Sequence, residues 1–338
     1  MAELWEKSFW YSFFRPYIDF CTRLSYTSLT VEGKFPDDGR ALIIAPNHTN
    51  TLLDALVVMQ HRRDTMAFGA RADIFSKPAA ARFLNYIKVV PIARKRDGIR
   101  AVAQNLEIMP VILDILHHGV PFCIFPEGRH RPMHSLLPIH KGVGRIALRN
   151  AADQPTCIVP VGIDYGDFFH YRSWCHIRIG EPIDMGEWMR EHEGEHEAKA
   201  SAEIGELLSE RLKSLILYIP DDENYERRLA EVRPPRRRRW WEIPLAVLTS
   251  PFFILSAILS LPLWGTAEYI CHRRLKDTAF RNSIRYLVRL AGTPIVFLLW
   301  AVVGFILLPH PVAFALLLYY CFSYSIFYDW LNLVRIDY

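Results

Sequence analysis

The sequence predicts an α/β fold, in which a mainly parallel sheet is flanked by helices, with an N-terminal amphipathic helix and a C-terminal hydrophobic helical membrane anchor. Short apolar runs alternate with helical patterns between residues 40 and 183, which is typical of βαβ units. Aromatic residues recur at helical spacing near the N-terminus, and long apolar runs follow residue 242. We therefore expect an interfacial helix over residues 1–30, a main domain over 31–232 and a membrane-anchoring region over 233–338.

An amphipathic helix is expected from Leu4 to Leu24. Aromatic and aliphatic side chains recur there every three or four residues, at Trp5, Phe9, Phe13, Tyr17, Phe20 and Leu24. So many aromatics favour a helix that lies in the lipid interface, and the alternative is a helix that caps the main domain. The charged residues in this segment do not fit a cleaved signal peptide.

The main domain is expected to hold six strands, because six short apolar runs lie between helical patterns. The strands are Ala41–Ala45, Met66–Ala70, Val89–Ile92, Pro121–Phe125, Thr156–Ile163 and His176–Ile179. Helices are expected over Leu52–His61, Ala79–Tyr86, Ile99–His117, Gly142–Ala152, Ser201–Leu217 and Asn224–Val232.

The C-terminal region begins with the basic stretch 233–241 and holds three apolar runs, Ile243–Trp264, Pro294–Leu308 and Val312–Phe327. The first run is long enough for a membrane span, which needs about 20 residues. Arginine and lysine flank it on both sides, so the positive-inside rule places both flanks, and the main domain, in the cytoplasm. This favours a re-entrant hairpin broken near Ser250–Pro251 or Ser256, and a second hairpin at Pro309–Pro311, over ordinary spanning helices.

The overall charge of +4 argues neither for nor against an anionic partner. The six cysteines form no CxxC pair and show no zinc-ligand spacing, which is typical of a reduced protein facing the cytoplasm. We expect membrane lipids as partners, no nucleic acid and no metal.

The segment 45–54, Ala-Pro-Asn-His-Thr-Asn-Thr-Leu-Leu-Asp, follows an expected strand and opens a helix. His48 then lies at the carboxyl end of a strand, where open α/β sheets place their sites. An imidazole can take a proton from a hydroxyl near neutral pH, and a carboxylate on its other nitrogen fixes the tautomer. Asp54 is the candidate for that carboxylate.

A second strand runs into the polar segment Pro126-Glu-Gly-Arg-His-Arg131. Gly128 lets backbone approach a ligand, and the guanidinium groups of Arg129 and Arg131 match phosphate oxygens. Lys141, at an expected helix start, is a further candidate for anion binding, with a plain surface lysine as the alternative.

Four ordered blocks between residues 40 and 164 resemble the glycerophospholipid acyltransferase superfamily, which includes glycerol-3-phosphate and 1-acylglycerol-3-phosphate acyltransferases. The blocks are the two segments above, residues 69–75 (Gly-Ala-Arg-Ala-Asp-Ile-Phe) leading to 90–96 (Val-Pro-Ile-Ala-Arg-Lys-Arg), and residues 158–164 (Ile-Val-Pro-Val-Gly-Ile-Asp). The resemblance implies a catalytic pair of His48 and Asp54, and glycerol-phosphate binding by Glu127, Gly128 and Arg94 or Arg96. Residues 31–232 would then be the acyltransferase domain.

Two features depart from the family pattern. Five residues separate His48 from Asp54, where four are usual, and Arg129-His130-Arg131 replaces Thr-Arg-Ser after Pro-Glu-Gly. The turn before the helix must therefore absorb one residue, and which arginine faces phosphate stays open.

The resemblance implies transfer of a fatty-acyl group from acyl-CoA or acyl carrier protein, without a cofactor, to 1-acylglycerol-3-phosphate in phosphatidate synthesis. The alternatives are glycerol 3-phosphate or another lysophospholipid as the acceptor. A non-catalytic membrane protein with the same fold is a different class. So is a zinc peptidase built on His192-Glu-Gly-Glu-His196, which the charged surroundings and Gly194 disfavour.

Overall fold

The computed structural model describes residues 4–6, 9–61, 65–93, 99–234 and 239–335. Within them, eight strands form one sheet in the order β1-β7-β6-β2-β5-β3-β4, and β8 pairs with β6. Five of the seven strand pairings are parallel, and only those of β6 with β7 and β8 are antiparallel. The predicted mainly parallel sheet is confirmed. The strands are β1 (Ser28–Glu32), β2 (Ala41–Pro46), β3 (Ala67–Arg71), β4 (Val89–Ile92), β5 (Phe122–Cys123), β6 (Thr156–Tyr165), β7 (Trp174–Ile179) and β8 (Ile183–Asp184).

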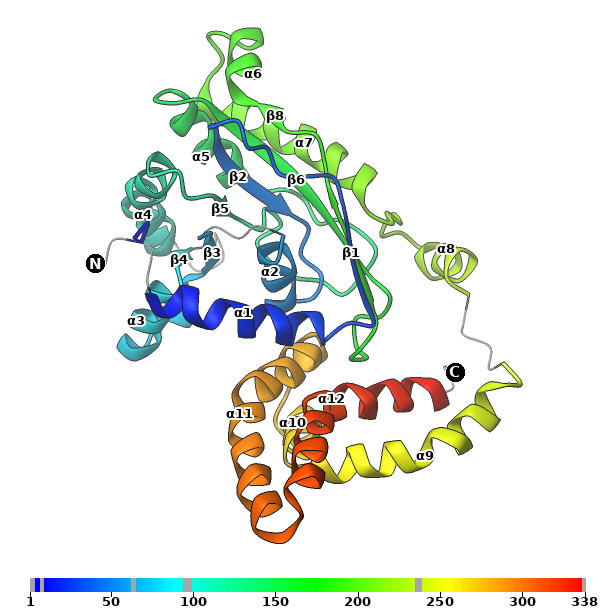
Figure 1. Ribbon diagram of the computed structural model, residues 1–338. Coiled ribbons are helices and arrows are strands. Elements are labelled where there is room, and N and C mark those ends of the chain that lie inside the picture. Colours follow the sequence, from blue (N-terminus) through cyan, green and yellow to red (C-terminus); the bar gives the residue numbers. More distant parts are fainter. Residues whose placement is uncertain (1–3, 7–8, 62–64, 94–98, 235–238, 336–338) are drawn as a thin grey trace.

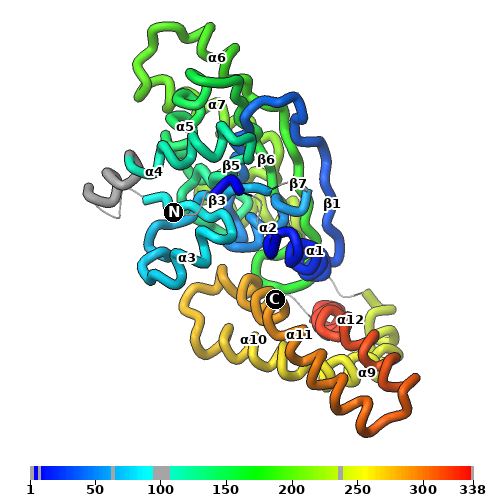
Figure 2. The backbone as a smooth tube through the Cα atoms, turned by 60° about the vertical axis from the view of Figure 1, so that its left-hand side comes forward, coloured from blue at the N-terminus to red at the C-terminus, as the bar shows by residue number. Residues whose placement is uncertain are grey.

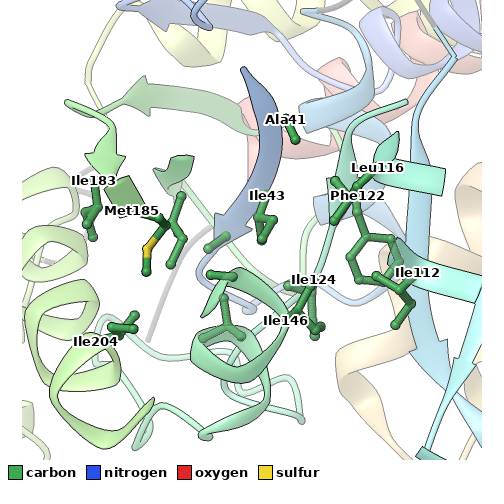
Figure 3. Packing of buried hydrophobic residues seen from close by; sticks show 14 of the residues in the cluster. Ala41, Ile43, Ile112, Leu116, Phe122, Ile124, Ile146, Ile183, Met185 and Ile204 are labelled. Carbon is green, nitrogen blue, oxygen red and sulfur yellow. The ribbon is translucent and has the colours of Figure 1, made fainter. Parts of the chain in front are cut away.

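Strand β2 lies in the middle of the sheet and is buried on both faces. Ile43 packs with side chains of the helices α4 (Ile99–His117), α5 (Gly142–Ala151) and α7 (Glu197–Leu215), as Figure 3 shows. Leu42 and Ile44 face the opposite cluster, which includes residues of α2 (Leu52–Met59). Burial of each such side chain stabilises the fold by about 1.5–3 kcal/mol. Helices on both faces explain why β2 is a continuous apolar run.

Shorter helices complete the domain and were only partly predicted. They are η1 (Ala72–Phe75), α3 (Pro78–Tyr86), α6 (Met185–Glu191) and α8 (Tyr225–Val232). The edge strand β1 and the short strand β8 were not predicted from the sequence. Because β1 pairs with β7 along its whole length, the sheet crosses the domain boundary that was predicted at residue 30.

The N-terminal helix α1 (Phe9–Arg23) begins later than the predicted Leu4. Leu4 is buried, and Trp5 stacks on His118 and donates its Nε1–H to Asp114 Oδ2 at 3.0 Å. These contacts hold the first described residues against α4, so Trp5 does not belong to the aromatic stripe. One side of α1 exposes five aromatic side chains: Phe9, Trp10, Phe13, Phe14 and Phe20.

The C-terminal region consists of α9 (Glu242–Leu259), α10 (Leu261–Arg273), the short helix η3 (Thr278–Phe280), α11 (Arg281–Leu307) and α12 (His310–Val334). Figures 1 and 2 show these helices as one group beside the sheet domain, with α9 along α12 and α10 along α11. The predicted break near Ser250–Pro251 or Ser256 is wrong. Pro251 lies inside α9, and the break comes at Ser260, where Pro262 occupies the first turn of α10. The predicted second break at Pro309 is confirmed.

Within the described part of the chain, three helical segments, 242–259, 278–307 and 310–334, are long and apolar enough to cross a membrane. Their outward sides expose large apolar residues, which have no covering protein partner among the described residues. Membrane association of this region therefore rests on both length and exposed apolar surface. Whether the helices span or re-enter stays a prediction.

Buried polar contacts tie these helices to the sheet domain. Arg285 of α11 forms an ion pair with Glu268 of α10 at 2.7 Å and donates to the Phe169 carbonyl, also at 2.7 Å. Arg172, after β6, binds Asp329 of α12 at 2.7 Å. An ion pair that is partly buried and also hydrogen-bonded fixes geometry more strongly than a surface pair. The C-terminal helices are thus docked on the domain.

Candidate active site

The site begins where β2 ends, in the segment 47–54, which we call the His48 turn. The Asn47 side chain donates to the Ile163 carbonyl at 3.0 Å and accepts the Ile163 amide hydrogen at 2.7 Å. This pair of hydrogen bonds fixes the start of the turn to the neighbouring strand β6. The sequence therefore places His48 at the carboxyl end of a central strand, as predicted.

The His48 ring contacts Asp54, and this prediction is confirmed. His48 Nδ1 lies 2.7 Å from Asp54 Oδ2, and the same oxygen accepts the amide hydrogens of Thr49 at 2.9 Å and Asn50 at 2.7 Å. Asp54 is fully buried, whereas the His48 side chain keeps 17% of its surface exposed. A buried carboxylate that accepts N–H donors at one oxygen holds the imidazole in one orientation and, in the neutral ring, favours the tautomer with its hydrogen on Nδ1.

The fifth residue between His48 and Asp54 is absorbed at Thr51. Its φ of 53° and ψ of −124° lie in a region that β-branched residues almost never adopt. Such a conformation costs on the order of 1–3 kcal/mol and persists only where the surroundings enforce it. Helix α2 begins directly after it, at Leu52, so Asp54 lies in the first turn of that helix.

Tyr165 completes the surroundings of Asp54, and the sequence analysis missed it. Its hydroxyl donates to Asp54 Oδ1 at 2.7 Å, and the side chain is fully buried. Burial, together with the charge of Asp54, raises the pKa of Tyr165 well above its ordinary value, so it stays a donor. One signal was present: Tyr165 directly follows the fourth sequence block on the strand next to β2.

Glu127 joins the second motif to the His48 turn through backbone groups. Its Oε1 accepts the His48 amide hydrogen at 2.7 Å, and its Oε2 accepts that of Leu137 at 2.8 Å. Burial raises the pKa of Glu127 to about 7, against the lowering effect of these two amides. The carboxylate therefore organises the loop around His48, and both of its oxygens have protein partners.

The loop that contains Glu127, residues 126–131, is further fixed at Gly128 and Arg131. Gly128 has a φ of +67°, and a Cβ there would lie 2.7 Å from His140 Cδ2, so a side chain is excluded. The Arg131 amide donates to the His48 carbonyl at 3.0 Å. The two motifs thus meet at one edge of the sheet.

The candidate phosphate-binding cations differ in their surroundings. The Arg131 guanidinium binds Asp221 and Ser135, and Lys141 Nζ donates to the Ala198 carbonyl of α7 at 3.1 Å. Arg129 is exposed and has no hydrogen bond or ion pair with another described residue. Arg94 and Arg96 lie outside the described residues. Of the predicted cations that the structure describes, Arg129 has the guanidinium most accessible to a ligand.

His130, to which the sequence analysis gave no role, lies beside His48. The two ring centroids are 5.7 Å apart, and the His48 ring also stacks on Phe125, with a centroid distance of 4.2 Å. His130 Nε2 is 3.3 Å from Asp277 Oδ2 in the link between α10 and η3. Burial lowers the pKa of His130, and neighbouring His48 lowers it further. At neutral pH, His130 is therefore an uncharged ring beside His48.

The H-E-x-x-H segment is not helical. His192 ends α6 and stacks on Trp188, Gly194 has a φ of +83°, and His196 caps the start of α7. A metalloprotease needs both histidines on one helix face. The described residues also contain no group of three or more metal-ligating side chains. This geometry argues against the zinc peptidase.

Comparisons with known proteins agree with the sequence blocks. Residues 28–164 match the family model described as Acyltransferase. A glycerol-3-phosphate O-acyltransferase of Saccharomyces cerevisiae is 39% identical over 82 residues, covering 23% of this chain and 11% of that protein. An uncharacterized acyltransferase of Schizosaccharomyces pombe is 25% identical over 109 residues, covering 31% and 16%. The chain thus spans less than a fifth of either relative.

Among solved structures, the chain is similar to the 1-acyl-sn-glycerophosphate acyltransferase PlsC of Thermotoga maritima. The match has a TM-score of 0.43 and 22% sequence identity, and it covers 61% of this chain and 80% of the other.

Proposed function

We propose that this chain transfers a fatty-acyl group from an acyl thioester to the hydroxyl of 1-acylglycerol-3-phosphate, as an enzyme of the glycerophospholipid acyltransferase superfamily that the four sequence blocks resemble. The match of residues 28–164 to the Acyltransferase family model supports this proposal. The observation that supports this most is the geometry of His48. Its Nδ1 is held by a buried carboxylate at 2.7 Å, while the ring stays partly exposed. That arrangement suits a general base that acts on a hydroxyl.

In the proposed reaction, His48 Nε2 takes the proton of the acceptor hydroxyl as its oxygen attacks the thioester carbonyl. A C–O bond forms, the tetrahedral intermediate collapses, and the C–S bond breaks. The imidazolium then returns the proton to the leaving thiolate, so a free thiol and an ester are the products. Asp54 stabilises the imidazolium between these steps, and no covalent acyl-enzyme is needed.

Acceptor binding is assigned to the loop 126–131 and to the second sequence block. Arg129 offers an exposed guanidinium close in sequence to the residues that contact His48. Guanidinium groups bind phosphate oxygens in a bidentate manner. Arg94 or Arg96 would supply a second cation, and Lys141, directed toward Ala198, is a weaker candidate.

Glycerol 3-phosphate is the second candidate acceptor. The Saccharomyces cerevisiae relative is a glycerol-3-phosphate O-acyltransferase, which supports this acceptor. The five-residue spacing between His48 and Asp54 supports it too, because it resembles a subset of glycerol-phosphate acyltransferase-like members. The donor is acyl-CoA or acyl carrier protein, and the domain faces the cytoplasm, where both donors are found. The apolar helices would hold the site at the bilayer, so a lipid product need not cross water.

The test is a transfer assay with the full chain in phospholipid vesicles. Labelled acyl-CoA is offered with 1-acylglycerol-3-phosphate, glycerol 3-phosphate or another lysophospholipid, and the product is identified by chromatography. We expect phosphatidate from the first acceptor, and loss of turnover by at least about 10²–10⁴-fold in His48→Ala, because a general base contributes that much. Retained activity in a folded His48→Ala would refute the role of His48, and no transfer to any acceptor would support a non-catalytic protein.

A further inference from the structure

The first turn of α11 reaches the His48 turn, although the two segments lie more than 200 residues apart in sequence. Ser283 Oγ lies 2.5 Å from Thr51 Oγ1, and both side chains are buried, with exposures of 2% and 5%. Figure 1 shows how α11 begins near α1 and α2, and residues of α11 contact both helices. A helix that could cross the membrane therefore touches the segment that carries the candidate catalytic pair.

The point of contact is the strained residue of the turn. Thr51 is the position at which the fifth residue is absorbed, and its backbone has a φ of 53°. A β-branched residue holds such a conformation only when neighbouring groups enforce it. The Ser283 hydroxyl is the one side-chain hydrogen-bond partner that the described residues give the Thr51 hydroxyl.

The apolar side of the turn is covered by the same helices. Leu53 is 1% exposed and packs in a cluster with Leu259 of α9, Leu263 of α10 and Tyr286 of α11. Asp54 follows directly on Leu53 and is itself fully buried. The C-terminal helices thus hold both residues 51 and 53, one by a hydrogen bond and one by packing.

We propose that Ser283 is a positioning residue, which holds Thr51 in its strained conformation and so keeps Asp54 in line with His48. This inference rests on the proposed function, because it assigns a role within the same reaction. It gives the C-terminal helices a part in catalysis besides membrane attachment. Ser283 touches neither the acceptor nor the thioester, and it acts only through the turn.

The proposal makes Ser283→Ala and Thr51→Val equivalent changes, since each removes one hydroxyl of the same pair. Each variant should lower kcat by about tenfold, because a buried hydroxyl loses its partner, while the acceptor KM stays within about twofold. The double variant should be no slower than either single variant, as expected for two groups that act through one contact. Thr51→Ser keeps the hydroxyl and should retain most of the activity.

Ser256→Ala is the matched control. Ser256 is fully buried, and its hydroxyl pairs with that of Tyr319 at 2.8 Å inside the C-terminal helices; among the described residues, its hydroxyl has no hydrogen bond to the His48 turn. Loss of a buried serine hydroxyl there should change the melting temperature as Ser283→Ala does, but leave kcat within about twofold. Rates are compared in vesicles of the same composition, with thermal unfolding measured in parallel.

Equal kcat for Ser283→Ala and Ser256→Ala would overturn the proposal, and so would additive losses in the double variant. If Ser283→Ala fails to fold, Thr51→Val and Thr51→Ser carry the same comparison from the other side of the contact. Failure of the proposed function looks different, because then either the natural chain transfers no acyl group to any acceptor or His48→Ala remains active. An inactive His48→Ala beside a fully active Ser283→Ala would refute this inference alone.

Discussion

The His48 turn and the loop 126–131 share one edge of the sheet, but their polar groups are satisfied in different ways. In the turn, the Asp54 carboxylate accepts hydrogen bonds from His48, Thr49, Asn50 and Tyr165. In the loop, backbone groups are fixed through Glu127, while the Arg129 side chain is exposed. Under the proposed function, this difference means that the protein preorganises the base, whereas the phosphate would be bound by side chains that gain partners only when the acceptor binds.

The strongest way to break this comparison is Asp54→Asn. An amide at this position cannot accept all the N–H donors of the carboxylate, and it no longer stabilises the imidazolium. We expect kcat to fall by roughly 10³–10⁴-fold, the range found when an aspartate that orients a catalytic histidine is replaced. Steady-state kinetics in vesicles measure it.

The control for that change is Asp329→Asn, which removes a carboxylate that binds Arg172 and, among the described residues, has no hydrogen bond or ion pair with His48. It should leave kcat within a few-fold of the unmodified chain. If Asp54→Asn keeps more than about a tenth of the activity in a folded protein, the hydrogen bonds of Asp54 do not preorganise His48 for the reaction.

Arg129→Ala and Arg131→Ala sharpen the comparison within the loop. Because charge-assisted hydrogen bonds contribute about 1.5–3 kcal/mol, loss of Arg129 should raise the acceptor KM by roughly 10–100-fold with little change in kcat. Arg131 already binds Asp221, so its loss should lower the unfolding free energy by at most about 1 kcal/mol and change KM by less than about threefold. A larger KM effect in Arg131→Ala would reverse the assignment.

The last expected effect concerns stability rather than turnover, through Glu127 and pH. Its pKa rises from 4.5 to about 7 in the fold, so the folded chain binds this proton more tightly than the unfolded chain does. The contribution of this proton to the stability of the fold is fully present below about pH 4.5 and is lost as the pH rises through 7. Unfolding in detergent should show that the free energy of unfolding of the natural chain, relative to that of Glu127→Gln, falls by about 1–3 kcal/mol between pH 5 and pH 8. A difference that does not vary with pH would contradict this.

The sheet was predictable where strands are buried on both faces. β2 and β6 are continuous apolar runs, and their neighbours in the sheet follow from βαβ alternation. The edge strand β1 was missed because its residues alternate between exposed and half-buried, which gives a weak apolar signal. The helix break was predicted at the wrong place because Pro251 lies inside α9 without ending that helix. Helix α12 packs along α9, and proline is tolerated within apolar helices that neighbouring helices support.

The site was predictable as far as it is local in sequence. His48 and Asp54 lie within one turn, and Gly128 and Arg129 lie within one loop. Tyr165 and Ser283 could not be found in this way, because their contacts depend on how distant segments meet. Tyr165 contacts Asp54 because β6 pairs with β2. Ser283 contacts Thr51 because α11 packs against the sheet domain.

The docking of the C-terminal helices also sets the smallest unit that can be studied in isolation. A fragment ending at residue 232 would leave Leu53, Cys21 and Tyr171 without the residues that cover them, and water would meet an apolar face directly behind the His48 turn. Such a fragment should aggregate, or fold with an altered turn, even in the absence of lipid. Assays, inhibitor screens and crystallisation therefore need the helices as much as the sheet.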